Sequence, residues 1–448
     1  MKICILGAGE SGTGAALLAK LLGHDVFVSD KGPIAPSYKD QLTNEGIQYE
    51  EGTHSEERIL QHELIIKSPG IPDKASLIVA AKAKAIEIID EIEFAFRNKR
   101  KGKIIAVTGS NGKTTTTRML QMLTANLPNV KVATGGNIGT SFASILYNEF
   151  KNEQSSDFYM LEVSSFQLDG CYKFRPDVSI ITNITPDHLD RYDYKFENYV
   201  ASKFRIAQAQ TDYNHFIYNA DNEVITDYVT QHFERSKTPM PFAISLKDID
   251  KGDSLDLEMF ICPKASLKIK GKHNFMNAAM AVRALLLSGF KKEEILPRLQ
   301  AFTPDAHRME SVATVNGVEY INDSKATNVD SVWYALDAIE TPIIWIAGGT
   351  DKGNDYTTLL PLVKGRIRAL ICMTTDDAKL RSVFAEHIPL IETVGSAKEA
   401  VEKAAALGQE GDTVLLSPAC ASFDLFKNYL DRGDQFKAAV TDLKGSDL

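Results

Sequence analysis

The stretch from Ile104 to Leu123 constrains the fold most strongly. An apolar, β-branched run leads into Thr-Gly-Ser-Asn-Gly-Lys-Thr and then into a helix-forming run. In this strand, loop and helix order, glycines let backbone N–H groups surround phosphate oxygens. Lys113 is expected to reach the β- and γ-phosphates, and the Thr114 hydroxyl to hold Mg²⁺. A plain glycine turn is the alternative, because Val107 stands where the commonest phosphate loop has glycine. The predicted ATP contacts of the loop are Gly109, Ser110, Asn111, Gly112, Lys113, Thr114 and Thr115.

Size and composition limit the possible partners. A chain of 448 residues suggests two to four domains. The net charge of −9 offers no basic surface for nucleic acid. The five cysteines are scattered without metal spacing, which favours reduced thiols in a cytosol. No apolar run approaches the ~18 residues of a membrane span, so we expect a cytoplasmic protein without a membrane partner.

The first thirty residues predict a β-α-β unit. Gly7, Gly9 and Gly12 form G-x-G-x-x-G, and Asp30 follows 18 residues after the last glycine. This spacing matches a dinucleotide fingerprint. NAD, another nucleotide diphosphate and a simple packing turn all remain possible explanations.

Three side chains of the central region are candidates for chemistry. Glu162 lies on an apolar strand, where a carboxylate is costly unless it is paired or bound to a metal. His188 follows another strand in a proline turn between two acids, and is either a ligand or an ordinary satisfied histidine. Lys203 lies on an apolar helix face, where the pattern alone favours a lysine whose stem is buried and whose head reaches water.

Polar turns supply further candidates. Asn137 lies in a glycine-rich turn, and Ser68–Pro72 forms a rigid turn after a strand. Asn274 is expected as the N-cap of a helix that ends near Leu287, and Asn277 on the same face could reach a base or ribose. The segment 97–103 is expected to be a solvated linker. In the last third of the chain, strands at 318–321, 343–347 and 413–416 each end in a polar or glycine-rich loop.

Several motifs together resemble the Mur ligases of peptidoglycan synthesis. They are the phosphate loop, E-V-S-S-F-Q at 162–167, N-I-T-P-D-H-L-D-R at 183–191, H-N-x-x-N at 273–277 and H-R at 307–308. The segments 323–328, 417–424, 426–429 and 432–434 resemble the branch of the family that adds D-glutamate. The likeness keeps the family's order along nearly the whole chain.

The resemblance implies an α/β fold of three domains. These are a Rossmann-like domain for the UDP substrate (1–96), a P-loop ATPase domain with a mostly parallel sheet (97–302) and a Rossmann-like domain for the amino acid (303–448). It also implies that ATP phosphorylates the carboxylate of UDP-N-acetylmuramoyl-L-alanine. The amine of D-glutamate then attacks the acyl phosphate, and ADP and phosphate are released. The expected state is a monomer.

The same resemblance assigns roles to residues. Lys113, Glu162, His188 and Lys203 are implied as catalytic, and two Mg²⁺ ions are held through Thr114, Glu162, His188 and a carbamylated Lys203. Further ATP contacts are Asn274, Asn277, Arg308 and Asp323. The implied UDP-substrate contacts are Glu10, Ser11, Gly12, Asp30, Lys31, Ser68, Gly70, Asn137, Ser164, Gln167 and His188. The implied D-glutamate contacts are Lys325, Thr327, Lys352, Ser422, Phe423 and Tyr429.

The sequence differs from the family pattern at two places, and three alternative functions stay open. Asp30-Lys31 stands where threonine and arginine are expected, and Glu10 is acidic where related chains are often apolar. Another Mur-type ligase or a folate polyglutamylating ligase would use a different amino acid. An NAD-binding redox sensor with an ATPase domain is a rival from another class, and a non-catalytic nucleotide-binding scaffold is the third.

Overall fold

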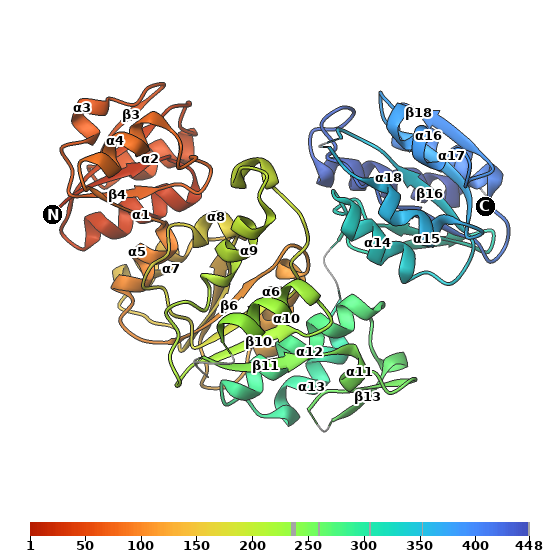
Figure 1. Cartoon of the computed structure of the whole chain (residues 1–448), viewed down its shortest axis with the longest axis horizontal. Helices are drawn as coiled ribbons and strands as arrows, with labels where there is room; N and C mark the ends of the chain where they lie inside the picture. Colours follow the sequence, from red (N-terminus) through yellow and green to blue (C-terminus); the bar gives the residue numbers. More distant parts are fainter. Residues whose placement is uncertain (234–238, 259, 304–305, 352, 447–448) are drawn as a thin grey trace. The chain divides into compact units, whose positions relative to one another are not determined.

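A computed structural model describes residues 1–233, 239–258, 260–303, 306–351 and 353–446. The chain forms two compact units (Figure 1). The first unit comprises Met1–Leu267 and Met276–Phe302, and the second comprises Lys268–Phe275 and Thr303–Leu448. The three domain boundaries expected from the resemblance stay a prediction. No helix among the described residues is both long and apolar enough to cross a membrane.

The N-terminal part of the first unit is a five-stranded parallel sheet in the order β3-β2-β1-β4-β5. Its apolar strands are buried on both faces, as a parallel sheet covered by helices requires. The strands are β1 (Lys2–Leu6), β2 (Asp25–Asp30), β3 (Gln48–Glu51), β4 (Leu64–Lys67) and β5 (Glu87–Ile89). The helices are α1 (Glu10–Leu21), α2 (Pro36–Asn44), α3 (Glu56–Ile59), α4 (Ser76–Ala83) and α5 (Glu91–Asn98).

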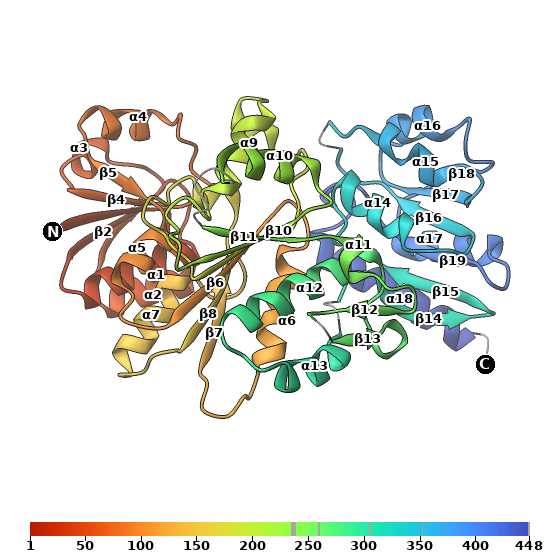
Figure 2. The same ribbon diagram turned by 60° about the horizontal axis from the view of Figure 1, so that its bottom comes forward.

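A six-stranded sheet forms the centre of the first unit, in the order β11-β10-β9-β6-β8-β7 (Figure 2). All its strand pairs are parallel, which confirms the predicted sheet type. The strands are β6 (Lys103–Thr108), β7 (Val132–Gly136), β8 (Phe158–Glu162), β9 (Val178–Ile181), β10 (His215–Asn219) and β11 (Met240–Ile244). The helices include α6 (Lys113–Thr124), α7 (Phe142–Lys151), α8 (Ser165–Leu168), α9 (Phe196–Phe204), α10 (Glu223–His232), α12 (Lys272–Leu287) and α13 (Lys292–Ala301). A small hairpin of β12 (Ser254–Asp256) and β13 (Ile261–Pro263) lies between α11 (Leu246–Ile249) and α12.

Helices α1 and α7 join the two sheets of the first unit. A Cβ on Gly14 of α1 would lie 2.2 Å from Ser144 Oγ of α7, so only glycine allows this approach. One apolar cluster runs from Ile5 and Ala16 of the first sheet layer to Phe142 and Leu161 of the second. The two sheets therefore share a continuous core.

The second unit is built on a six-stranded sheet in the order β14-β15-β19-β16-β17-β18. Only β14 is antiparallel to its neighbour. Along β16, Trp345 faces one apolar cluster and Ile344 faces another, because successive side chains of a strand point to opposite faces. The strands are β14 (Glu310–Val315), β15 (Val318–Asn322), β16 (Ile343–Ala347), β17 (Ile367–Met373), β18 (Ile391–Val394) and β19 (Thr413–Leu416). The helices are α14 (Val329–Asp337), α15 (Leu360–Val363), α16 (Ala378–Phe384), α17 (Ala397–Leu407) and α18 (Tyr429–Ser446).

Two local predictions are wrong. Asn274 is not an N-cap, since α12 begins at Lys272 and the Asn274 amide donates to Lys270 O at 2.9 Å. The segment 97–103 is only partly a linker. Arg97 lies in the last turn of α5, which ends at Asn98, and forms an ion pair with the buried Glu93; β6 already begins at Lys103.

Candidate active site

The phosphate loop connects β6 to α6 at the carboxyl edge of the central sheet. Gly109 has φ +148°, and a Cβ there would lie 1.9 Å from Thr182 Oγ1. Gly112 is in the left-handed region at φ +82°, and a Cβ there would lie 2.7 Å from Asn277 Oδ1. The loop therefore needs both glycines, and Asn277 is placed against it. The N–H groups of Ser110 and Asn111 are fixed by Asn183 at the end of β9, at 2.8 Å each.

Two lysines meet at the Gly109 carbonyl. Lys113 Nζ donates to Gly109 O at 2.8 Å and to Ser110 O at 2.9 Å, and Lys203 Nζ donates to the same Gly109 O at 2.7 Å. Lys203 is only 1% exposed, so the snorkelling alternative is wrong. Burial, reinforced by the charge of Lys113, lowers the pKa of Lys203 well below its usual value. The charge of Lys113 therefore faces the loop, while the neighbouring Lys203 is shifted toward its neutral form.

Glu162 ends β8, beside β6, in register with Val107. The residue is 2% exposed. Its Oε1 accepts a hydrogen bond from the Asn137 amide at 2.9 Å, whereas the buried Oε2 has no hydrogen-bond partner. An unsatisfied carboxylate oxygen is a suitable ligand for Mg²⁺, which prefers oxygen donors. Among the described residues no three histidine, cysteine or acidic side chains gather into a metal cluster. A cation here would therefore rely on Glu162 together with hydroxyl, imidazole or substrate ligands.

A cavity of about 220 Å³ opens beside Lys113, Lys203 and Asn137, and the Asn137 amide links it to Glu162. His188 borders it in the left-handed backbone conformation at φ 52°, with its ring against Phe166 at 5.1 Å between centroids. Ser164 also lines the cavity, while the side chain of Gln167 bonds back to Ser164 in a capping box at the start of α8. The cavity is lined by Pro69, Gly70, Lys113, Asn137, Ser164, Ser165, Phe166, Asp187, His188, Tyr199 and Lys203.

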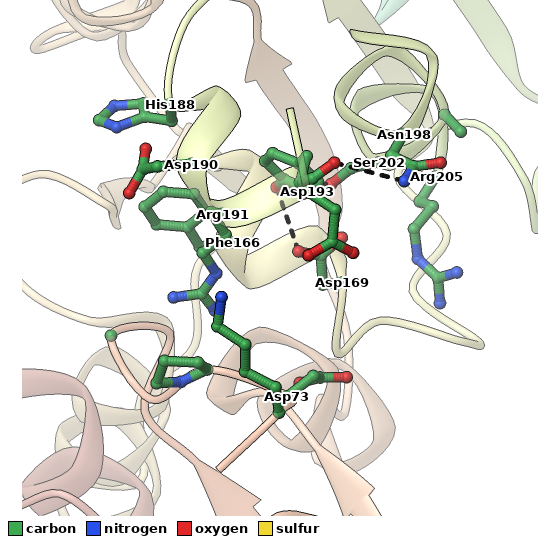
Figure 3. A pocket seen from close by; sticks show the side chains of 15 residues that line it. Asp73, Phe166, Asp169, His188, Asp190, Arg191, Asp193, Asn198, Ser202 and Arg205 are labelled. Atoms are coloured by element: carbon green, nitrogen blue, oxygen red, sulfur yellow. Dashed lines mark hydrogen bonds between the residues drawn. The ribbon is translucent and has the colours of Figure 1, made fainter. Parts of the chain in front are cut away.

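A larger cavity of about 690 Å³ shares Gly70, Phe166 and His188 with the first (Figure 3). Arg191 lies over the Phe166 ring at 4.3 Å. Sequence reasoning did not predict this cavity, because its lining comes from a turn near residue 72 and from residues 166–205, which only folding brings together. Its remaining lining is Pro72, Asp73, Lys74, Asp169, Asp190, Tyr192, Asp193, Asn198, Ala201, Ser202 and Arg205.

The two unusual acids of the N-terminal turn bind the protein's own backbone. Asp30 Oδ2 accepts from Ala8 N at 2.7 Å and its Oδ1 accepts from Gly32 N at 2.8 Å. Glu10 Oε1 accepts from Ser141 N at 3.0 Å. Asp30 therefore stabilises the turn itself, whereas Glu10 binds the start of α7 in the central part of the unit. The other predicted UDP-substrate residues of this part lie on the same carboxyl edge: Ser11 and Gly12 begin α1, Lys31 follows β2, and Ser68 and Gly70 follow β4.

In the second unit, Asp323 follows β15 and accepts from Ser417 Oγ at 2.9 Å and from Met309 N at 3.2 Å. Burial raises the pKa of Asp323 to about 7, and Arg308 is among the nearby charges that oppose this rise. The buried Arg308 Nε has no hydrogen-bond partner. Arg308 and Asp323 are thus close together, while Asn274 belongs to the second unit and Asn277 to the first.

The predicted amino-acid contacts gather at three strand-end loops of the second unit. Lys325 Nζ lies 5.4 Å from the Tyr429 ring centroid. Ser422 is buried and Phe423 is 70% exposed. Thr327 lies two residues beyond Lys325, whose backbone oxygen accepts from Thr327 N at 2.9 Å. Lys352 lies outside the described residues.

Arg432 in the first turn of α18 holds these loops together. Its buried guanidinium donates to Ser324 O at 2.9 Å, to Cys420 O at 3.2 Å and to Gly348 O at 3.4 Å. Sequence reasoning quoted Arg432 only as part of a motif. The sequence carries no signal for this role, because neither the burial of Arg432 nor the backbone oxygens that it binds follow from residue types.

A strand-end phosphate loop with an adjacent buried lysine, an unpaired carboxylate oxygen and a histidine defines a nucleotide-dependent α/β enzyme. Three family matches agree with this class: "MurD N-terminal domain" over residues 2–77, "Mur ligase middle domain" over 107–285 and "Mur ligase, glutamate ligase domain" over 307–420. The chain belongs to the Mur ligase family.

Curated relatives resemble the chain over its whole length. A protein of Christiangramia forsetii named UDP-N-acetylmuramoylalanine–D-glutamate ligase is 48% identical, with 99% of each chain covered. Proteins of the same name from Cytophaga hutchinsonii and Porphyromonas gingivalis are 47% and 46% identical, with 99% and 98% of each chain covered.

Solved structures show the same fold at low identity. The pseudomurein peptide ligase type C from Methanothermus fervidus has a TM-score of 0.58 at 19% identity, covering 99% of this chain and 100% of that chain. The MurF ligase from Thermotoga maritima in complex with ADP has a TM-score of 0.60 at 14% identity, covering 93% and 95%. The three-domain α/β class expected from the motifs is confirmed by these relatives.

Proposed function

We propose that this Mur ligase joins D-glutamate to UDP-N-acetylmuramoyl-L-alanine at the expense of ATP, in the synthesis of peptidoglycan precursors. The observation that carries the proposal is one cavity beside the phosphate loop, lined by Lys113, His188 and Lys203, with Glu162 bonded to Asn137 of its lining. The names of relatives up to 48% identical over the whole chain support the choice of substrates.

The charges of the site suit phosphorylation of a carboxylate by ATP. Both reactants are anions, so their approach requires cations and N–H donors in a water-excluded site. Lys113 and the start of α6 would face the phosphates, and Lys203, once modified, would supply an oxygen ligand. Mg²⁺ held through Thr114, Glu162 and His188, at two sites, would act as a Lewis acid for the transferred phosphoryl group. The oxygen of Glu162 without a partner supports this assignment.

Carbamylation of Lys203 belongs to the same proposal. An amine must be neutral to attack CO₂; the new N–C bond then forms a carbamate and one proton is released. Burial and the charge of Lys113 both favour the neutral amine. We expect Lys203→Ala to lose turnover and to regain part of it with a small carboxylic acid, which would supply the missing anionic oxygen. An unmodified lysine in an enzyme with full turnover would contradict this part.

The second unit would bind the amino acid. D-glutamate carries two carboxylates, and Lys325, Thr327, Ser422 and Tyr429 lie at adjoining strand-end loops of that unit. Lys352 and the Phe423 backbone complete the proposed set. The proposal also includes the three domain boundaries that the resemblance implies, a monomeric state and a cytoplasmic location.

A phosphate-release assay tests the proposal. With ATP, Mg²⁺ and UDP-N-acetylmuramoyl-L-alanine, we expect release with D-glutamate and none with L-glutamate, alanine or diaminopimelate. Lys113→Ala is expected to abolish nucleotide binding. Release with another amino acid would favour a different Mur-type or folate-type ligase, and NAD-dependent absorbance changes would favour the redox-sensor alternative.

A further inference from the structure

The loop from Asn137 to Ser141 includes Asn137, which lines the reaction cavity. It follows β7, which is the edge strand of the central sheet, so no strand among the described residues flanks it on its outer side. Asn137, Gly139 and Thr140 are exposed. The loop is closed at its base by Gly136 N donating to Thr140 O at 2.9 Å.

The inner end of this loop is fixed to the catalytic carboxylate. Asn137 N donates to Glu162 O at 2.8 Å, and the Asn137 amide donates to Glu162 Oε1 at 2.9 Å. A Cβ on Gly136 would lie 2.3 Å from Glu162 O, so the backbone is already as close as glycine permits. Small movements of the loop therefore change the hydrogen bond that orients Glu162.

The outer end of the loop is fixed by Glu10. The Glu10 carboxylate accepts from Ser141 N at 3.0 Å, and Glu10 is the first residue of α1, directly after the turn predicted to meet the nucleotide diphosphate. The tight packing of Gly14 against α7 holds α1 at this distance. Glu10, which directly follows the predicted nucleotide turn, is thus connected to Asn137 through the backbone of the Asn137–Ser141 loop.

We infer that Glu10 is a positioning residue for the reaction, which fixes the Asn137–Ser141 loop so that the Asn137 amide orients Glu162. The inference rests on the proposed function. It differs from a nucleotide-binding role for the Glu10 side chain, because the orientation of Glu162 affects turnover, whereas nucleotide contacts affect substrate affinity.

A double-mutant cycle on the full chain tests this inference. Glu10→Ala is expected to lower kcat about tenfold, the upper range for one hydrogen bond. Glu10→Gln keeps an acceptor oxygen for Ser141 N and is expected to stay within about threefold of the wild type. On an Asn137→Ala background, Glu10→Ala is expected to change kcat by less than about twofold, because coupled residues are not additive.

Glu45→Ala is the matched control. Glu45 also joins the first sheet layer to α7, since its Oε1 accepts from Tyr147 Oη at 2.6 Å and from Lys151 Nζ at 2.8 Å. It contacts the other half of the helix, away from the loop. We expect this variant to keep the wild-type kcat.

The outcomes separate the two claims. Additive kcat losses for Glu10→Ala and Asn137→Ala, a rise in KM alone, or an equal kcat loss in Glu45→Ala would each overturn the positioning role. A wild-type chain that releases no phosphate with both substrates would instead overturn the proposed function.

Discussion

The reaction cavity of the first unit and the strand-end loops of the second unit are built on opposite principles. Around the cavity, two lysines share one carbonyl, and a buried oxygen of Glu162 has no hydrogen-bond partner. In the second unit, Arg432 donates to carbonyls of three loops, and Asp323 accepts two hydrogen bonds. The cavity keeps an oxygen of Glu162 available for a ligand, while Arg432 in the second unit uses its guanidinium to hold loops in place.

This contrast has an energetic meaning. A buried charge or polar atom that lacks a partner costs free energy of folding, so it persists where a ligand uses it. A buried donor that satisfies several carbonyls contributes to stability instead. Substitutions in the first region should therefore change turnover more than stability, and substitutions in the second should do the reverse.

Glu162→Gln should give the largest effect. We expect turnover to fall by at least about 10³-fold, because the substitution removes the charge that would hold a metal worth several kcal/mol to the transition state. The melting temperature should stay equal or rise, since a buried charge is removed. Phosphate release and calorimetry measure the two quantities.

Glu149→Gln is the control for this substitution. Glu149 accepts from Ser156 Oγ and Tyr159 Oη at 2.6 Å each, away from the cavity. It should leave turnover unchanged. Near-normal turnover in Glu162→Gln would contradict the view that the cavity of the first unit keeps this carboxylate for a ligand.

The second-largest effect should be the pH dependence of the stability of the second unit. The pKa of Asp323 is raised from 3.8 to about 7 in the folded chain, so between these values the folded state holds a proton that the unfolded state has lost. Stability from Asp323 is then greatest below pH 4, falls as the pH rises to 7 and is level above. The loss is on the order of 4 kcal/mol at most.

Both tryptophans, Trp333 and Trp345, belong to the second unit, so denaturant unfolding followed by their fluorescence reports on this unit. Asp323→Asn should flatten the slope between pH 4 and 7. An unchanged slope in the variant would show that other groups control it.

Arg432→Met should destabilise the second unit by about 3 kcal/mol, because it leaves buried carbonyl oxygens without donors. Arg381→Met is the comparison, since Arg381 is exposed and pairs with Asp377 at 2.7 Å on one helix turn. It should cost less than about 1 kcal/mol. Equal losses, measured by the same fluorescence, would contradict the role of Arg432.

Tyr356→Phe should give the smallest effect, about 1 kcal/mol. The buried Tyr356 hydroxyl donates to Asp351 Oδ2 at 2.7 Å and contacts Cys420 Sγ at 2.9 Å. Nucleotide affinity of the first unit should not change. A weaker ATP affinity in this variant would show that the two regions are less independent than the comparison implies.

The strands with continuous apolar runs were predictable from local pattern. The bounds of β16, Ile343–Ala347, and of β19, Thr413–Leu416, match the prediction. Strands β3 and β14 were missed, because their residues are polar or half-exposed and show no apolar run. Edge strands depend on pairing with a neighbour, and local sequence does not specify that partner.

The candidate site divides in the same way. Lys113 was expected from the phosphate-loop motif, and Glu162 and His188 from polar residues at strand ends together with the resemblance to Mur ligases. The roles of Glu10 and Arg432 were not, since each contacts backbone atoms of segments about a hundred residues away or brought together by packing. Hydrogen bonds to backbone atoms of distant segments do not depend on residue type there, so sequence spacing does not predict them.

By itself, the sequence determined the phosphate loop, the strands with continuous apolar runs and the membership of the Mur ligase family. The tertiary structure alone decided that Lys113 and Lys203 share the Gly109 carbonyl and that Glu10 binds the loop beside Asn137. Local pattern follows from the preferences of neighbouring residues. Contacts between distant residues depend on sheet register and helix packing, which only the folded chain establishes.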